Sequence, residues 1–520
     1  MVGAALALPW LNPISLGPTA AMVQLLFTGF CVSLALLCLA WRFDTHKNTD
    51  DLALQAAQAW LLAALVSCLM ALLQFLGLTG ELAPWVNPTQ VGEAFANLRQ
   101  RNQFASLVNI GLAALIGIVS WQTTRAIDQA SALRARSWWP LFAAILLGVG
   151  NAASSSRTGL LQLLALTLSM WAWGRMLDPQ IRRIFRCVFA SYIAATFLLP
   201  ALIGADLGDA GMLSRLHLDG QACSSRLILW RNVIELIALR PLAGWGWGEL
   251  DYAHFVTLYP AGTQGRFCEI LDNAHNLPLH LAVELGVPLA LFVCGLLGWL
   301  VIRARPWGER DATRQMAWGV LLVIGLHSLL EYPLWYGPFQ LAACLSLALL
   351  WLTPRHLSIT STKELMRRPR ASTTAADAPP LCGKARIGIV GAAVVLLASV
   401  AYAGWDYRRI MQIYLNPVER AEPYRRNTLE KIGDSWLFSH QVQFAALTIT
   451  QLTPENAADV NAKAHALLHF SPEPRVVEKL IQSARMLGRD AEAAYFETRY
   501  QAAFPATYPA AYQRLQQSSP

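Results

Sequence analysis

Several short polar clusters stand at the ends of long apolar stretches, and they contain the residues that could do chemistry. In segment 272–276 (Asp-Asn-Ala-His-Asn), His275 follows Asp272 by three positions. A histidine near a carboxylate can act as a general base at neutral pH, although a lone histidine is more often structural. We therefore treat His275 as the candidate base.

One arginine stands where an anion could bind. Arg157 lies in segment 154–159 (Ser-Ser-Ser-Arg-Thr-Gly), on a short connection between apolar stretches. Free N–H groups at a helix start and a planar guanidinium suit an anion. Arg226 lies early in a segment of the long loop with helical spacing that ends at Arg240. An arginine near the end of a membrane span can equally extend to the interface, so both interpretations stay open for Arg157.

Two further clusters place polar groups beside apolar stretches. Segment 101–105 (Arg-Asn-Gln-Phe-Ala) contains Asn102 and Gln103, whose amides could donate hydrogen bonds to a polar ligand. A helix cap with an interfacial anchor is the alternative for this cluster. Segment 327–336 contains Glu331 and Tyr332, and ionisable residues at membrane depth are functional candidates.

The chain that must position these clusters is unusually apolar. Of its 520 residues 55% are hydrophobic and 14% are charged, and the mean hydropathy is +0.37. Soluble domains carry about 25% charged residues, so lipid must solvate most of this chain. We predict an all-α polytopic membrane protein with about 11–12 transmembrane helices, since about 20 apolar residues cross a bilayer. The apolar stretches are 2–12, 20–41, 52–77, 104–122, 137–153, 159–176, 187–204, 277–302, 315–331, 338–353 and 387–404.

Basic residues recur in alternate loops, which predicts the orientation of the spans. The net charge is +8, and about half of the 41 lysines and arginines lie in these loops. Cytoplasmic loops are enriched in lysine and arginine, so we expect these loops on the cytoplasmic side. Membrane topology then explains the positive net charge, which was the main argument for nucleic-acid binding. The loops hold Arg42 and Lys47; Arg125, Arg134 and Arg136; Arg175, Arg182, Arg183 and Arg186; Arg303, Arg305, Arg310 and Arg314; and the basic residues from Arg355 to Arg386.

The candidate chemistry falls on the opposite side, together with a long loop of about 205–276 and a polar tail. We predict a membrane domain over 1–404 and a C-terminal helical domain over 405–520. Helical segments at 456–469 and 474–487 resemble tetratricopeptide packing weakly, and an ordinary helical cap is the alternative. A Ser/Thr/Ala/Pro-rich stretch at 361–380 is typical of a cytoplasmic linker.

Two of the nine cysteines, Cys223 and Cys268, lie in the long loop. If that loop faces an oxidising compartment such as a bacterial periplasm, the two can pair, and we predict a disulfide between them. The sequence shows no Walker A loop, no Gly-x-Ser-x-Gly elbow and no zinc-type Cys/His spacing. These observations disfavour a soluble nucleotide-using enzyme and indicate chemistry at the surface of a multispanning protein.

Over about residues 90–350 the motifs occur in the order found in bacterial O-antigen ligases, and the chain resembles that family. The resemblance is carried by 101–105, the 154–159 turn, Arg226 with Trp230, His275-Asn276 followed after nine residues by Gly286, and 331–336 (Glu-Tyr-Pro-Leu-Trp-Tyr). The first and last of these look most similar to protein O-oligosaccharyltransferases, the pilin glycosylation ligases. The chain departs from the family at Asn102, where we would expect a proline.

The resemblance implies en bloc transfer of an oligosaccharide from an undecaprenyl-diphosphate carrier to an acceptor hydroxyl, by inverting attack and without cofactor or metal. It assigns His275 to activating the acceptor, Arg157 and Arg226 to the diphosphate, and Gln103 and Tyr332 to lining the site. The expected location is the bacterial inner membrane, with the site on the periplasmic face.

The partners implied are the lipid-linked oligosaccharide, membrane lipid and a pilin-like acceptor protein. Lipid A–core as acceptor (an O-antigen ligase) and a growing glycan (an O-antigen polymerase) are the alternatives. A polysaccharide or lipid transporter and a non-catalytic membrane scaffold are competing classes. A transporter would be expected to carry polar residues on both faces, and a scaffold would tolerate loss of His275.

Overall fold

The computed structural model describes residues 1–14, 18–42, 48–125, 138–205, 223–355 and 383–517, and every regular element in these ranges is a helix. The predicted linker at 361–380, together with Arg134 and Arg136, lies outside the described residues. The chain is a polytopic, all-helical membrane protein. Six helical windows are apolar and long enough to cross a membrane: Ala21–Trp41, Thr49–Phe75, Arg101–Thr123, Pro179–Leu202, Val287–Gly308 and Ala385–Tyr414.

The helices lie where the apolar stretches predict them. α8 begins at Pro179 instead of residue 187, because Asp178 caps it by accepting the Gln180 N–H at 2.8 Å. Several of the other helices are shorter than the about 20 residues that a full crossing needs, so the predicted total of about eleven crossings stays a prediction. The bundle helices are α1 (Val2–Leu11), α2 (Ala20–Arg42), α3 (Asn48–Phe75), α4 (Arg101–Arg125), α6 (Trp139–Ala153), α7 (Arg157–Ala172), α8 (Pro179–Leu202), α14 (Ala312–Ser328), α15 (Gly337–Leu352) and α17 (Gly383–Ile410).

The single span predicted at 277–302 is wrong, because the chain breaks there into α12 (Leu277–Leu285) and α13 (Val287–Ala304). Gly286 between them has φ +87° and ψ 156°, a backbone conformation that is essentially restricted to glycine. A Cβ at this position would lie 2.1 Å from the Leu242 carbonyl oxygen. The backbone of Leu242 therefore occupies the place that a side chain at position 286 would need in this conformation.

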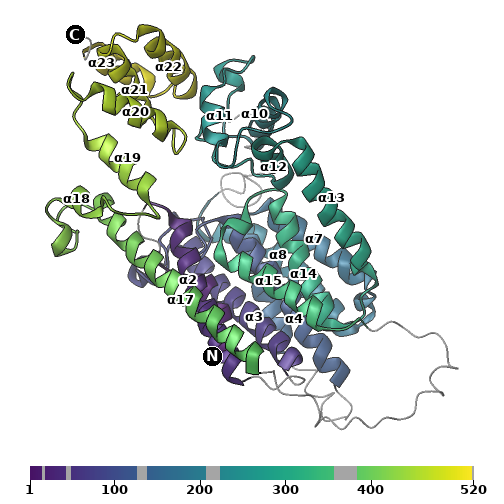
Figure 1. The fold of residues 1–520 in the computed structure, drawn as a ribbon. Helices are drawn as coiled ribbons and strands as arrows, with labels where there is room; N and C mark the ends of the chain where they lie inside the picture. Colours follow the sequence, from purple (N-terminus) through teal and green to yellow (C-terminus); the bar gives the residue numbers. More distant parts are fainter. Residues whose placement is uncertain (15–17, 43–47, 126–137, 206–222, 356–382, 518–520) are drawn as a thin grey trace.

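α4 forms the centre of the bundle, with 94% of its spanning window buried. It packs against α3, α6, α7 and α14. α13 and α17 lie at the periphery, with only 6% of their windows buried, and Figure 1 shows both running along the outside of the bundle. The core around α4 is thus the rigid body that positions the helix ends described below.

Three of the basic loops meet at one end of the bundle, as the charge pattern predicts. Arg175 donates to the Arg310 carbonyl at 3.0 Å, and Arg355 donates to the Arg305 carbonyl at 2.7 Å. The Trp173 indole N–H donates to the Pro306 carbonyl at 2.7 Å. The segments before α8, between α13 and α14, and after α15 therefore share one end.

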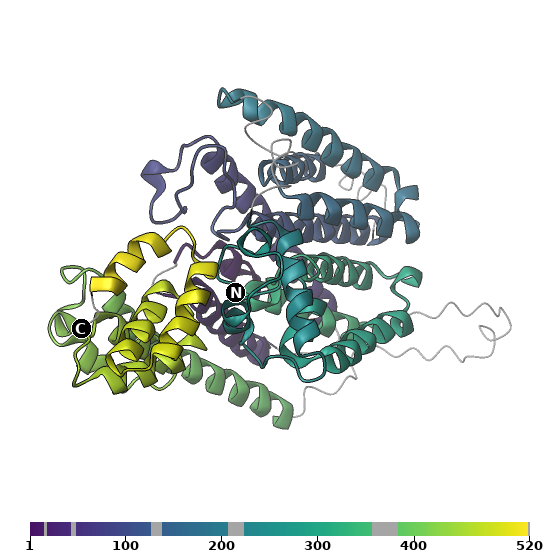
Figure 2. The same cartoon turned by 90° about the horizontal axis from the view of Figure 1, so that it is seen from above.

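The other end carries two further helical groups (Figures 1 and 2). The first comprises α10 (Arg226–Leu239), α11 (Leu250–Val256) and α12. The second is C-terminal and has its own apolar core, to which Phe255 of α11 also belongs. The two groups are joined by Glu249 and His469, with Oε2 and Nδ1 2.7 Å apart. The second group holds α19 (Ser439–Ile449), α20 (Ala457–Leu468), α21 (Pro474–Met486), α22 (Asp490–Ala503) and α23 (Tyr508–Gln517). α18 (Thr428–Ile432) comes before it, and Ile432 belongs to a separate apolar cluster with Tyr407 and Ile410 of α17.

Candidate active site

The carboxylate of Glu331 joins three segments that are far apart in the sequence. Glu331 follows the end of α14 and its side chain is only 5% exposed. One oxygen, Oε1, accepts a hydrogen bond from the Asn102 amide of α4 at 3.0 Å and another from the guanidinium of Arg226 at the start of α10. The other oxygen, Oε2, lies 2.6 Å from Nδ1 of His275. Two of the residues that the sequence singles out thus meet on one buried carboxylate.

The backbone fixes His275 in this position. His275 has φ +50°, and its N–H donates to the Asn273 side chain at 2.8 Å. The next residue, Asn276, caps α12 through the Leu279 N–H at 3.0 Å. The Asn276 amide also donates to the Leu329 carbonyl at 3.0 Å, which ties the start of α12 to the end of α14.

The contact with Glu331 decides which ring nitrogen of His275 is available. Burial by itself would raise the pKa of the Glu331 carboxyl, but the hydrogen bond from His275 and the charges of His275 and Arg226 outweigh it and hold that pKa below its usual range. An ionised carboxylate only accepts hydrogen bonds, so Nδ1 carries the proton and Nε2 is the atom that can act as a base. Among the residues that the structure describes, none makes a hydrogen bond to Nε2.

Arg157 directly follows Ser156, which belongs to this network. Asn102 accepts a hydrogen bond from the Ser156 hydroxyl at 2.6 Å, and that hydroxyl accepts the Gly159 N–H at 3.0 Å as the cap of α7. Arg157 is the first residue of α7 and its side chain is exposed. Arg226 is likewise the first residue of α10 and follows the capping Ser225. Both arginines therefore stand at helix N-termini, where anions are favoured.

The residues predicted to line the site flank His275. The Tyr332 ring packs edge-on against the imidazole, with the ring centres 5.1 Å apart. Tyr336 stacks on Tyr332 at 6.1 Å. Burial raises the pKa of the Tyr336 phenol, while the adjacent Gln103 and Tyr332 side chains act in the opposite direction. The structure thus brings Gln103 and Tyr332 together with His275 through Tyr336.

His327, which the sequence groups with Glu331, lies in the bundle core instead. Its Nδ1 is 2.9 Å from the Ser106 hydroxyl, and that hydroxyl accepts from the Gln162 amide at 2.8 Å. Gln162 in turn accepts from Asn109 at 3.1 Å. Such interhelical hydrogen bonds hold membrane helices in register, here α4, α7 and α14. The network fixes the helices whose ends carry Asn102, Ser156 and Glu331.

Cys223 and Cys268 are disulfide-bonded, with their Cα atoms 5.5 Å apart. The bond joins the residues just before α10 to the segment that leads to His275. A second link lies beside it, where the Trp230 indole N–H donates to the Ala274 carbonyl at 3.1 Å. Arg226 and His275 are therefore held on one covalently closed unit.

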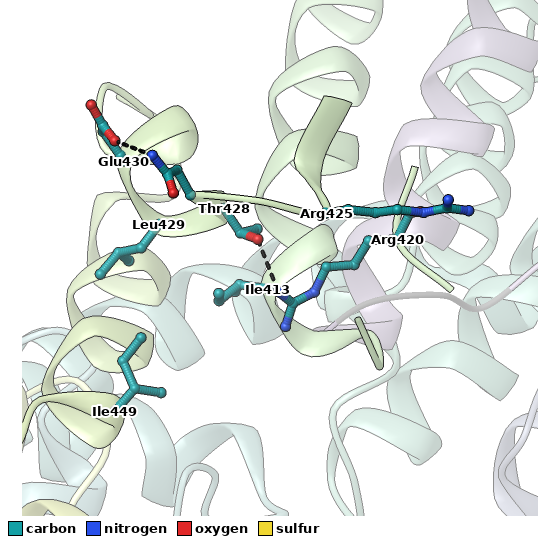
Figure 3. A pocket seen from close by; sticks show the side chains of 8 residues that line it. Ile413, Arg420, Arg425, Thr428, Leu429, Glu430 and Ile449 are labelled. Carbon is teal, nitrogen blue, oxygen red and sulfur yellow. Dashed lines mark hydrogen bonds between the residues drawn. The ribbon is translucent and has the colours of Figure 1, made fainter. Parts of the chain in front are cut away.

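Other features contribute nothing to this site. Within the described ranges, no group of three or more His, Cys, Asp or Glu side chains could hold a metal ion. An open hollow lies after α17, lined in part by Arg420, Arg425 and Thr428 (Figure 3). In it Arg420 donates to the Thr428 hydroxyl at 2.9 Å. The hollow includes none of the residues that surround Glu331.

The sequence marks Glu331 as a functional candidate, because it is the one acidic residue in the 327–336 segment at the end of an apolar stretch, but it predicts no specific role for this residue. Asn102 is predicted only as a possible hydrogen-bond donor to a polar ligand, and Ser156 receives no role of its own. An amide and a hydroxyl at helix starts are ordinary caps, so their contacts with each other and with Glu331 could not be predicted.

The chain is a polytopic membrane protein, and its candidate histidine, carboxylate and arginines lie at one end of the helix bundle. This arrangement is typical of an enzyme whose active site lies at a membrane surface. Three family models match the chain: "Protein glycosylation ligase" at residues 94–116, "O-Antigen ligase" at 142–294, and "Virulence factor membrane-bound polymerase, C-terminal" at 315–518. The first covers Asn102, the second covers Arg157, Arg226 and His275, and the third covers Glu331. No solved structure matches the chain.

Two curated proteins of Acinetobacter baylyi are similar to the chain. The ComP-specific O-oligosaccharyltransferase is 24% identical over 300 residues, which are 57% of this chain and 51% of the relative. The general O-oligosaccharyltransferase is 25% identical over 293 residues, which are 54% of this chain and 47% of the relative. The chain spans about half the length of these relatives. Over these ranges the chain is similar to the membrane-bound O-antigen ligases and protein glycosylation ligases.

Proposed function

We propose that this protein is an oligosaccharyltransferase that moves a glycan en bloc from undecaprenyl diphosphate to a Ser or Thr hydroxyl of an acceptor protein. The observation that carries the proposal is the meeting of His275 and Arg226 at Glu331, at the end of the bundle opposite the basic loops. With those loops cytoplasmic, the site faces the periplasm.

In the proposed reaction Nε2 of His275 takes the proton from the acceptor hydroxyl as its oxygen attacks the anomeric carbon. The bond from that carbon to the diphosphate oxygen breaks, and the polyprenyl diphosphate leaves with the electron pair. Arg226 and Arg157 supply planar guanidinium groups that bind phosphate oxygens bidentately and stabilise the charge that develops on them. A base on one face of the sugar and cations on the other favour in-line attack with inversion.

The acceptor is proposed to be a pilin-like protein, because segments 101–105 and 331–336 resemble the pilin glycosylation ligases and the model that covers Asn102 is described as protein glycosylation ligase. Lipid A–core is the second candidate, since the model that covers His275 is described as O-antigen ligase. The purified protein with a lipid-linked oligosaccharide, offered pilin in one reaction and lipid A–core in another, separates the two.

The same assay tests the base. His275→Ala should abolish transfer while the protein stays folded, since a positioned general base contributes about 10²–10⁴-fold. His465→Ala is the matched control, because His465 also contacts a glutamate, Glu492 at 2.7 Å, but does so within the C-terminal helices. Near-normal turnover by His275→Ala would remove the base from the proposal.

A further inference from the structure

The Glu331 carboxylate has two partners that the proposed reaction uses for different substrates. His275 would activate the acceptor, and Arg226 would bind the diphosphate of the donor. Glu331 is almost completely buried, whereas the Arg226 side chain is 31% exposed. The Arg226 guanidinium thus reaches from an accessible position onto a carboxylate fixed in the protein.

We infer that Glu331 is a positioning residue that couples donor binding to the activation of His275, by holding the imidazole and by competing with the diphosphate for Arg226. The inference rests on the proposed function. It concerns a residue that takes no part in bond making or breaking: the acceptor proton goes to Nε2, and the proton on Nδ1 remains on His275.

The competition follows from charge. A carboxylate and a diphosphate are both acceptors for the planar guanidinium fork, which binds either group best through two parallel hydrogen bonds. A diphosphate that binds Arg226 bidentately must therefore weaken the contact of Arg226 with Oε1. The buried negative charge of Glu331 thus lowers the affinity of the site for the donor.

The remaining contacts keep Glu331 in place when Arg226 turns to the donor. The Asn102 amide still donates to Oε1, and Asn102 is itself held by the Ser156 hydroxyl. With Arg226 withdrawn, the carboxylate keeps two hydrogen-bond donors, the Asn102 amide and the Nδ1–H group of His275. The guanidinium then no longer competes with the imidazole for the carboxylate, which places activation of the acceptor after donor binding.

A purely structural role of Glu331 and the proposed competition predict different effects of its loss on diphosphate binding. If Glu331 only fixed α10 to the end of α14, its loss would loosen Arg226 and weaken diphosphate binding. Competition predicts the reverse, which is tighter diphosphate binding with slower turnover. The opposite signs make the two roles separable.

The test compares Glu331→Gln with Glu309→Gln. Glu309 is a matched control, because it is equally buried, and accepts from Arg314 at 2.8 and 2.9 Å at the opposite end of α14. Equilibrium binding of glycan-free undecaprenyl diphosphate and the kcat and KM for the lipid-linked oligosaccharide are measured in detergent. We expect Glu331→Gln to bind the diphosphate at least about threefold more tightly and to lose about 100-fold or more in kcat. Glu309→Gln should change neither.

Diphosphate binding that is unchanged or weaker in Glu331→Gln overturns the competition, and an unchanged kcat overturns the positioning of His275. In an Arg226→Ala background, Glu331→Gln should no longer alter diphosphate affinity; a persistent gain would show that Glu331 acts by repulsion alone. If Glu331→Gln does not fold, Glu331→Asp keeps the charge and should keep wild-type diphosphate affinity with reduced kcat. Failure of the proposed function is distinct, because the wild-type protein would then neither bind undecaprenyl diphosphate nor transfer a glycan.

Discussion

The break at Gly286 should be essential to the site, and replacing this glycine tests that directly. In Gly286→Ala the new Cβ would lie 2.1 Å from the Leu242 carbonyl oxygen and 2.6 Å from its carbon, both backbone atoms that no side-chain rotation can remove. The backbone at 286 has φ +87° and ψ 156°, which costs a non-glycine residue about 1–3 kcal/mol.

The hydrogen bonds around the break at Gly286 would add to the destabilisation caused by Gly286→Ala. The Val287 N–H donates to the Pro241 carbonyl at 2.8 Å, and the Trp245 and Gly246 N–H groups donate to the carbonyls of Val283 and Glu284 at 2.8 and 2.9 Å. If the loop retreats far enough to lose two of them, at about 1 kcal/mol each, the total destabilisation is roughly 3–5 kcal/mol. His275 stands directly before α12, and a displacement of about 1 Å there can reduce turnover by about 100-fold.

Thermal unfolding in detergent and glycan transfer are the assays. Gly295→Ala in α13 is the matched control, since a Cβ there meets nothing within 4 Å and alanine is favoured over glycine inside a helix by about 0.5–1 kcal/mol. We expect Gly286→Ala to unfold at a lower temperature than both wild type and Gly295→Ala, and to transfer glycan more slowly. Equal unfolding temperatures and full activity would refute the reasoning.

Three other outcomes follow from the structure. Arg226→Lys should reduce kcat/KM for the donor, because an ammonium lacks the two-pronged geometry of the guanidinium; wild-type kinetics would reduce Arg226 to a loop anchor. Replacing Cys223 and Cys268 together by serine should lower the unfolding temperature, since a bond that closes a 45-residue separation stabilises by up to about 4 kcal/mol; an unchanged melting curve would make the bond dispensable. Burial raises the pKa of the Asp251 carboxyl to about 7, so ionisation destabilises the fold increasingly as pH rises from about 4 to about 7. Asp251→Asn should therefore raise the melting temperature at pH 8 and leave it unchanged at pH 4, and equal effects at both pH values would contradict this.

Much of the fold could be predicted because its determinants are local. A run of about 20 apolar residues specifies a membrane helix wherever it occurs, and the basic loops that meet at one end of the bundle could be grouped from charge alone. The break at Gly286 was missed because apolar residues continue on both sides of it. The local signals are Gly286 itself and Pro288 two positions later, at the start of a new helix.

The site could be predicted only in part, for a different reason. The loops predicted on one side of the membrane held His275, Arg226 and Gln103, so their common location followed from topology. The contacts between these residues could not be predicted from topology, because Glu331 lies 229 positions from Asn102 and 105 positions from Arg226. The spacing of residues in one sequence does not predict which side chains at the same membrane face will contact each other.

The shared core between α11 and the C-terminal helices has a consequence for how the protein is made. Phe255 is synthesised about 200 residues before Val460 and Leu480, which belong to the same apolar cluster in the finished protein. The Tyr252 ring likewise stacks on His469, with the ring centres 3.9 Å apart. Until the C-terminal helices have been made and folded, the apolar side of α11 lacks these packing partners. The C-terminal helices, which are translated last, therefore complete an apolar core to which α11 contributes and which cannot form while the chain is still being made.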